Sequence, residues 1–259
     1  MIDISVVIPT YKRSDLLKRL LRSIAAQTLK PKEVIVVDDC SEMTAEYKKV
    51  IEEYRECFPS LLFLEQPENG GAPKARNRGI RQASCDWVAL VDDDDEWLPG
   101  KLKAQAKIIQ DSNFKNLGLV YTWTRADGAN GMASYDSKIS VSGDARSYIV
   151  TTNFIMSASV IVKKRAIVEA GLFDEALPSC QDWDMWIRIF LKGYECDVAK
   201  EILTIYHRHG GESIGLSARA LEGYRLLLEK HWLPILKYTQ PLNWAKKSFL
   251  YLKTRLSAA

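Results

Sequence analysis

Residues 87–95 read Trp-Val-Ala-Leu-Val-Asp-Asp-Asp-Asp, a short apolar run that passes directly into four successive acids. Residues 4–11 and 33–39 repeat this form, since in each of them a β-branched apolar run ends in polar residues. Runs of this length and composition are typical of strands buried inside a sheet. The three segments therefore predict three buried strands with polar residues at their carboxyl ends.

Segments with helical periodicity lie between these strands, as at residues 14–24, where leucine and isoleucine recur three or four positions apart. Strands that alternate with helices predict an α/β fold, a mostly parallel and doubly wound sheet flanked by helices. In such sheets ligands bind beyond the carboxyl ends of the strands. The further predicted elements are helices over 44–57, 73–83, 101–110 and 182–191, and strands over 61–64, 117–123 and 159–162.

Length and composition are those of an ordinary globular protein. The chain has 259 residues, of which 47% are hydrophobic and 27% charged, and it contains no internal repeat or low-complexity linker. We therefore expect one catalytic unit followed by a helical tail after Gly215. Prolines interrupt helices, so we expect breaks in this tail at Pro234 and near Pro241.

The N-terminus and the cysteines predict a cytoplasmic location. The apolar residues 4–8 follow no basic segment of a secretory signal, and no apolar run has the length of a bilayer span. The five cysteines are scattered and form no C-x-x-C pair. This usage argues against a disulfide framework and against a zinc site.

The aspartate run predicts a metal site. Adjacent acids repel one another, and burial raises the pKa of each carboxyl group. A divalent cation removes this cost, and carboxylate oxygens suit Mg²⁺ or Mn²⁺ better than zinc. Mg²⁺ usually binds one or two carboxylates and completes its shell with substrate phosphates. The run therefore predicts a metal-dependent diphosphate site, and the alternative is a solvated loop in which Asp95 caps the next helix.

Six short motifs follow one another in a specific order between residues 5 and 213. Any one of them alone is weak evidence, whereas six in order are strong evidence. The motifs are Ser5–Arg13 (SVVIPTYKR), Val34–Ser41 (VIVVDDCS), Asn69–Ile80 (NGGAPKARNRGI), Leu90–Pro99 (LVDDDDEWLP), Gly171–Glu175 (GLFDE) and Gln181–Trp186 (QDWDMW).

This series resembles the inverting glycosyltransferases of family 2, which have the GT-A fold. The resemblance implies a Rossmann-like GT-A domain over residues 1–215, with a nucleotide-binding half at about 1–115 and an acceptor-binding half at about 116–215. Residues 216–259 then form a basic helical C-terminal extension. The implied reaction moves a sugar from a nucleotide-diphosphate sugar, with a UDP-sugar favoured, to a hydroxyl of a glycan or lipid-linked acceptor. The implied cofactor is Mn²⁺ or Mg²⁺, and the implied setting is bacterial surface polysaccharide biosynthesis.

The resemblance also assigns the donor site. Asp92 and Asp94 match the outer acids of the D-x-D motif, with Asp92 near the ribose and sugar and Asp94 on the metal. Asp93 fills the variable middle place and is counted with the substrate-binding residues. Asp95 is expected to be structural.

A nucleotide pocket is implied by residues at the ends of the first two strands. Thr10, Tyr11 and Asp39 match it, with Tyr11 packing on the base and Asp39 accepting a hydrogen bond from a ring N–H. Arg13 adds positive charge, and Arg76 matches the arginine near the nucleotide. Taken alone, Tyr11 fits ordinary strand-end packing equally well, and Asp39 fits an ordinary turn.

Asp182 matches the acid that the family uses as general base. It would take the proton from the acceptor hydroxyl as that oxygen attacks the anomeric carbon. The chain departs from the family pattern at Gln181, where glutamate is usual, which puts the contribution of that glutamate in doubt. Asp184 is the alternative base, and Trp183 could face the acceptor sugar or pack in the core. Asp182 could also cap the helix that follows.

The segment from Tyr206 to Ser213 resembles a late loop of the family, in which His209 can contact the metal or the diphosphate. His207 stands here in place of the usual arginine. Two glycines after His209 suit a loop that closes over a substrate. A lone histidine is otherwise usually structural or merely exposed.

Two other functions compete with this one. A nucleotidyltransferase would need a glycine-rich basic loop after the first strand, and residues 9–13 contain no glycine. A non-catalytic nucleotide-sugar-binding module would keep the acids but need no base, and Asp182 argues against it. Nucleic acid is not an expected partner.

The tail after residue 218 carries eight Lys or Arg residues against two acids. This excess predicts an anionic partner, such as the inner face of the cell membrane. The alternatives are a helix that packs on the catalytic domain, or a homodimer contact.

Overall fold

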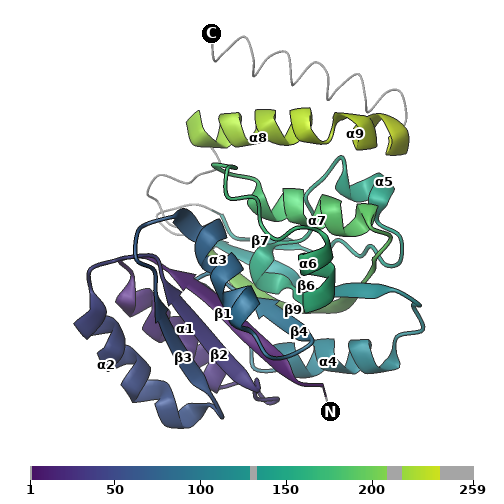
Figure 1. Ribbon diagram of the computed structural model, residues 1–259. Coiled ribbons are helices and arrows are strands. Elements are labelled where there is room, and N and C mark those ends of the chain that lie inside the picture. The colour runs from purple at the N-terminus through teal and green to yellow at the C-terminus, as the bar shows by residue number, and fades with distance from the viewer. Residues whose placement is uncertain (1, 129–132, 209–217, 240–259) are drawn as a thin grey trace.

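The computed structural model describes residues 2–128, 133–208 and 218–239, and shows a central sheet covered by helices on both faces (Figure 1). The strands are β1 (Ile4–Thr10), β2 (Glu33–Asp38), β3 (Leu61–Glu65), β4 (Trp87–Leu90), β5 (Asp95–Trp97), β6 (Leu117–Gly128), β7 (Tyr135–Ser137), β8 (Ile161–Lys163) and β9 (Glu195–Arg208). The α-helices are α1 (Ser14–Ala25), α2 (Thr44–Tyr54), α3 (Gly71–Gln82), α4 (Lys101–Asp111), α5 (Arg146–Ile149), α6 (Lys164–Glu169), α7 (Gln181–Leu191), α8 (Ala218–Lys230) and α9 (Trp232–Tyr238), and short 3₁₀ turns lie at Arg55–Cys57 and Ser157–Ser159.

The first half of the sheet is parallel, as the alternation of strands and helices predicts. Strands β3, β2, β1 and β4 lie side by side in that order, and all three ladders between them are parallel. Side chains of β1 alternate between two core clusters, since Val6 and Ile8 pack with α1 and α2 while Val7 packs with α3. A Cβ at Gly79 of α3 would lie 2.5 Å from Val7 Cγ1, so only glycine allows α3 to lie this close to the sheet.

The second half of the sheet mixes both directions. Strand β8 is antiparallel to β4 and to β6, β9 is parallel to β6, and β5 is antiparallel to β9. The expectation of a mostly parallel sheet therefore holds for β1 to β4 and not for the strands beyond them. Strands β4 and β5 stand four places apart in the sheet, yet only residues 91–94 connect them. The aspartate run thus lies in a short crossing between distant strands.

Helices α8 and α9 form an outer layer over α5 and α7 (Figure 1). Leu227, Leu228 and Ile235 belong to the same core cluster as the apolar residues of α7. A Cβ at Gly223 would lie 2.8 Å from the backbone nitrogen of Ser179, so α8 approaches the start of α7 closely. Within the described part of the chain, no helix has both the length and the hydropathy that a membrane span requires.

Candidate active site

The carboxyl ends of β1, β2 and β4 bring the predicted site residues together. The backbone N–H of Asp39 donates to the carbonyl of Thr10 at 2.9 Å, which joins the ends of β2 and β1. The Thr10 hydroxyl donates to Asp93 Oδ2 at 2.7 Å, which joins β1 to the aspartate run. Thr10 therefore connects the end of β2 to the aspartate run.

The four aspartates alternate between buried and solvent-facing positions. Asp93 and Asp95 are 4% and 3% exposed, whereas the side chains of Asp92 and Asp94 are 35% and 18% exposed. The run forms a tight turn, in which the backbone N–H of Asp95 donates to the carbonyl of Asp92 at 3.2 Å, and this turn directs the four side chains to different sides. The structure therefore separates two acids that can reach a ligand from two acids that face the protein. Asp95 begins β5 and does not cap the next helix, whose N-cap residue is Gly100.

Burial raises the pKa of Asp93 to about 6, with Asp94 adding to the rise and the Thr10 hydroxyl opposing it. Burial likewise raises the pKa of Asp95 well above the ordinary value for aspartate, and the charges of Asp92 and Asp94 add to it. Arg13 Nη1 lies 3.3 Å from Asp93 and 2.8 Å from Asp94, so one cation is shared between two acids. The run therefore carries more negative charge than Arg13 offsets.

This arrangement fits a divalent cation that arrives with a phosphate ligand. Among the described residues, no group of three or more His, Cys, Asp or Glu side chains is placed to hold a metal alone. The outward carboxylates of Asp92 and Asp94 could supply the one or two oxygen ligands that Mg²⁺ takes from a protein when phosphates complete its shell. The oxygen-only donor set suits Mn²⁺ equally well.

The nucleotide-pocket residues differ in how they are held. Tyr11 is 41% exposed, so its ring is available for stacking. Asp39 is buried, and its two carboxylate oxygens accept from the backbone N–H groups of Gly70 and Gly71 at 2.9 and 2.7 Å. Asp39 therefore anchors the start of α3. Each carboxylate oxygen has a second lone pair, which leaves acceptor capacity for a ligand.

Arg76 connects the aspartate run to helix α7. Its Nη2 lies 2.5 Å from Asp92 Oδ1, and its Nη1 donates to Gln181 Oε1 at 3.4 Å. The guanidinium also lies over the ring of Phe173, 5.5 Å from the centroid. Arg76 is only 7% exposed, so it acts in this structure as a buried bridge between α3, the acids and α7. The resemblance implies that Arg76 lies near the nucleotide. The contact between Arg76 and Gln181 could not be predicted from the sequence.

Asp182 lies in the first turn of α7, next to this bridge. Its Oδ2 accepts from Asn153 Nδ2 at 3.2 Å, and its Oδ1 accepts from the N–H of Trp183 at 2.7 Å. The N-cap position belongs to Cys180, so Asp182 is not the cap residue. Burial raises the pKa of Asp182, while Asn153 and the charge of Arg76 oppose the rise. A carboxylate with a raised pKa binds a proton more readily, which suits a general base.

Two predicted substrate-binding residues are turned into the protein. Trp183 is 9% exposed and its indole N–H donates to the carbonyl of Ile149 at 2.6 Å, so it packs in the core. Asp184 has no exposed surface, because its carboxylate pairs with Arg188, His231 and Lys230 at 2.6, 2.7 and 2.9 Å. Of the two alternatives for Trp183 the structure shows the core-packing one, and Asp184, the alternative base, has ion-pair partners in place of a substrate-facing surface. Of the remaining predicted residues, His209 lies outside the described residues.

Tyr47 is a site residue that the sequence did not indicate. Its hydroxyl lies 3.0 Å from Thr10 Oγ1 and accepts from the backbone N–H of Arg13 at 3.0 Å. Arg19 likewise reaches the site, where its Nη2 donates to the backbone carbonyl of Asp94 at 2.5 Å. Both residues stand on helices with an ordinary amphipathic pattern, so no local signal marks them. Tyr47 fixes the backbone that follows β1, and Arg19 fixes the backbone within the aspartate run.

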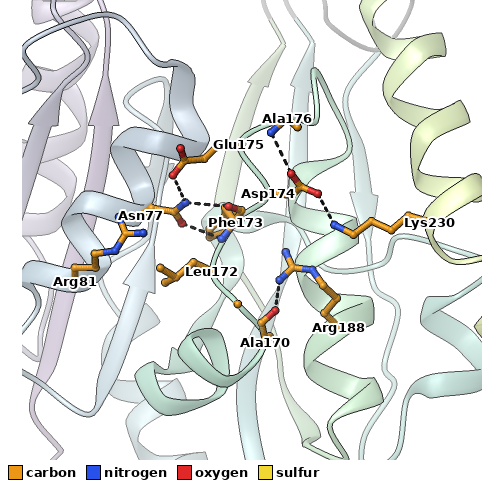
Figure 2. A pocket seen from close by; sticks show the side chains of 11 residues that line it. Asn77, Arg81, Ala170, Leu172, Phe173, Asp174, Glu175, Ala176, Arg188 and Lys230 are labelled. Carbon is orange, nitrogen blue, oxygen red and sulfur yellow. Dashed lines mark hydrogen bonds and ion pairs between the residues drawn. The ribbon is translucent and has the colours of Figure 1, made fainter.

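A separate pocket of about 490 Å³ lies between α3, the turn at residues 170–176 and α8 (Figure 2). Asn77 donates there to Glu175 Oε1 at 2.8 Å, and Lys230 lies 2.5 Å from Asp174 (Figure 2). These polar side chains bond one another across the pocket. The GLFDE motif therefore joins α3 to α8.

Comparison with known proteins gives the family. The family model described as Glycosyl transferase family 2 matches residues 5–163. The uncharacterized glycosyltransferase YwdF of Bacillus subtilis is 31% identical over 235 residues, which cover 89% of this chain and 84% of that protein. The amylovoran biosynthesis glycosyltransferase AmsB of Erwinia amylovora is 28% identical over 257 residues, which cover 94% of this chain and 85% of that protein.

Solved structures share the fold. S. aureus TarS in complex with UDP-GlcNAc matches with a TM-score of 0.72 at 24% identity, over 99% of this chain and 73% of that one. The mannosyltransferase PcManGT from Pyrobaculum calidifontis, in complex with GDP-Man and Mn²⁺, matches with a TM-score of 0.69 at 18% identity, over 98% of this chain and 73% of that one. These likenesses confirm the GT-A fold. With the model match over more than half of its length, the chain belongs to glycosyl transferase family 2 and is a glycosyltransferase.

Proposed function

We propose that this enzyme is a metal-dependent, inverting glycosyltransferase that moves a sugar from a nucleotide-diphosphate sugar to an acceptor hydroxyl. The observation that carries the proposal is the bridge made by Arg76. One guanidinium contacts Asp92 of the outward acid pair and Gln181, the neighbour of Asp182. A donor site and an acceptor-side base are thereby fixed relative to each other.

On the donor side, Asp92 and Asp94 are the residues that would hold Mn²⁺ or Mg²⁺ together with the diphosphate. The bound ion supplies charge stabilisation for the leaving group. Arg13, beside Asp94 at 2.8 Å, places a further positive charge at this position. The exposed ring of Tyr11 stacks on the base, and Asp39 accepts from its N–H. His209 would complete the site as a ligand of the metal or the diphosphate.

On the acceptor side, Asp182 acts as general base. The acceptor hydroxyl gives its proton to the Asp182 carboxylate while its oxygen forms a bond to the anomeric carbon. The bond from that carbon to the nucleotide diphosphate breaks on the opposite face, so the configuration inverts. The raised pKa of Asp182 supports this role, because it brings the carboxyl group nearer to the pH at which the enzyme works.

The substrates are proposed from the relatives. AmsB is named for amylovoran biosynthesis, which supports a role in bacterial surface polysaccharide biosynthesis with a glycan or lipid-linked acceptor. TarS binds UDP-GlcNAc and PcManGT binds GDP-Man, and of these donors we favour a UDP-sugar. A hydrolysis screen of UDP- and GDP-sugars with and without Mn²⁺ tests the proposal. Release of nucleoside diphosphate from one donor supports it, whereas activity only on sugar phosphate and nucleoside triphosphate indicates a nucleotidyltransferase.

Replacing Asp94 by Ala is expected to abolish the Mn²⁺-dependent part of donor binding. The change removes one of two outward carboxylates, and the outer oxygen ligands are few. A thermal-shift titration with UDP-sugar, in Mn²⁺ and in chelator, measures the effect. Asp111→Ala, an exposed acid at the end of α4, is the matched control and should keep the Mn²⁺ response of the native enzyme. An undiminished Mn²⁺ response in Asp94→Ala contradicts the metal assignment.

Replacing Arg76 by Lys is expected to lower kcat/KM for donor hydrolysis by about tenfold, because an ammonium lacks the fork that reaches Asp92 and Gln181 together. Arg81→Lys, an exposed position on the same helix, controls for the general effect of the substitution. Steady-state kinetics on the two variants gives the comparison. Equal rates for both would show that the bridge has no part in catalysis.

A further inference from the structure

Helices α8 and α9 bury one face against the catalytic domain and expose the opposite face. His231 and Ile235 are 3% and 1% exposed, whereas Leu233, two residues from each, is 75% exposed. Two residues turn a helix by about 200°, so Leu233 points away from the domain. Leu221 stands in the same relation to the buried Gly223 and is 51% exposed.

The exposed face combines apolar side chains with positive charge. Leu236 is 42% exposed, and the neighbouring Lys237 is exposed as well. The acids of α8, Glu222 and Glu229, both lie 2.7 Å from Arg225. Their charges are therefore partly offset within α8, and the lysine of α9 faces solvent beside two leucines.

The sequence continues this character to its end. From Lys230 to Ala259 there are six Lys or Arg residues and no acid, together with two tryptophans, two tyrosines and a phenylalanine. Basic residues interspersed with leucine and aromatic residues are typical of segments that lie in the headgroup region of a bilayer. A second copy of the chain would bring the same positive charge to this face and would be repelled.

We propose that the outer face of α8 and α9 docks on an anionic phospholipid bilayer, a partner that the basic composition of the chain from Lys230 onward favours. Leu221, Leu233 and Leu236 enter the headgroup region, and the cations contact the phosphate groups. The helices lie on the surface, since their inner face is already packed against the catalytic domain through Leu227, Leu228 and Ile235.

Docking at this face would set the orientation of the proposed catalytic site. His231, at the junction of α8 and α9, hydrogen-bonds to Asp184 at 2.7 Å, and Asp184 lies two residues after Asp182 on α7. The membrane-facing layer is therefore linked directly to the helix that carries the proposed base. This consequence rests on the proposed function and suits a lipid-linked acceptor, whereas the membrane binding itself does not depend on it.

Co-sedimentation of the full-length protein with vesicles tests the proposal. We expect binding to phosphatidylcholine vesicles that contain phosphatidylglycerol, little binding to pure phosphatidylcholine, and release at high salt. Leu233→Ser with Leu236→Ser should weaken binding by at least about tenfold, because two leucines no longer transfer into the bilayer. Val168→Ser, a single apolar-to-polar change at a 51% exposed position on α6, is the control and should bind as the native protein does.

Charge reversal gives a second arm. Lys237→Glu should weaken binding by at least about fivefold. Lys48→Glu, on the exposed side of α2, should leave binding unchanged. The proposal is wrong if the native protein stays in the supernatant with anionic vesicles, or if the control variants lose as much binding as the test variants.

Light scattering on the same samples separates membrane docking from self-association. A leucine variant that turns a dimer into a monomer while its vesicle binding stays at the native level would assign this face to a second copy and overturn the proposal. Donor hydrolysis is measured without vesicles. If the native protein hydrolyses no nucleotide sugar in this assay, the proposed function is refuted, and the result on membrane docking is unaffected.

Discussion

Replacing Asp182 by Asn should lower kcat for sugar transfer by about 10²- to 10⁴-fold, because the amide cannot accept the proton of the acceptor hydroxyl. Donor affinity should stay within about twofold, since the substitution leaves the acids, Arg13 and Tyr11 in place. Steady-state transfer assays and nucleotide-sugar titration on the same preparation measure the two effects. If transfer survives in the variant, Asp182 is not the base.

Asn153→Ala is the matched control for this assignment. Asn153 donates to Asp182 Oδ2, and this hydrogen bond opposes the rise that burial causes in the pKa of Asp182. Its removal should raise the pKa of Asp182 further. A base works in its deprotonated form, so the acid limb of the kcat/KM profile should move to higher pH while activity at alkaline pH is retained. An unmoved acid limb would mean that it reports another group.

Replacing Asp184 by Ala should lower the free energy of unfolding by about 3–5 kcal/mol, because Arg188 and His231 would remain buried without their anion. For a chain of this length the change corresponds to a fall of roughly 6–20 °C in Tm. Thermal unfolding followed by circular dichroism measures it. Asp174→Ala, which removes a half-exposed partner of Lys230, is the control and should cost about 1 kcal/mol or less. Similar Tm values for both variants would contradict this role.

The same carboxylate predicts a pH dependence of stability. Burial alone would raise the pKa of Asp184, but the hydrogen bond from His231 and the charge of Arg188 outweigh it and hold the pKa well below the ordinary value. A carboxyl group with a depressed folded-state pKa stabilises the protein above its unfolded pKa of about 4, and this contribution is lost as the pH falls below that value. Native enzyme should therefore lose Tm steeply below about pH 4, whereas Asp184→Ala should lose less.

The parallel half of the fold could be predicted from the sequence because its elements are local. Each of β1, β2 and β4 is a short apolar run, and helices lie between these strands along the chain. The family resemblance, confirmed by the comparisons, rests on the same stretches.

Strand β9 could not be predicted, because bulges interrupt its alternation. Its ladder with β6 shifts register between Thr122 and Trp123, where the partners move from Ala199 to Ile202. A strand that is irregular at its centre has no regular period of two along the sequence. The sequence pattern therefore did not predict a 14-residue strand at this position.

The position of the break between α8 and α9 could also not be predicted from the sequence. Pro234 marks a break in the sequence, but the helix interruption lies at His231, because a proline is accepted in the first turn of α9. The ring of Pro234 would clash with the carbonyl of Lys230 if the helix continued. Pro234 therefore does interrupt the helix, but the interruption lies at the residues before the proline.

Site residues could be named from the motifs, but their contacts could not. The motif QDWDMW offers Asp182 as base, Asp184 as its alternative, and Trp183 as either an acceptor contact or a core residue. Of these three, only Asp182 keeps partial exposure beside Arg76. Trp183 and Asp184 point inward because a helix turns about 100° per residue, and α7 is covered by α8 on that side. Long-range pairs such as Asp184 with His231 join residues 47 positions apart, for which a single sequence holds no signal.

In the proposed donor site, Asp92 and Asp94 would hold a divalent cation together with a pyrophosphate. Calorimetric titration of the full-length enzyme with UDP, in Mn²⁺ and in excess chelator, tests it most directly. Because two outward carboxylates would hold the ion, we expect chelation to weaken UDP binding by at least about tenfold. Equal affinity in both buffers would contradict the claim.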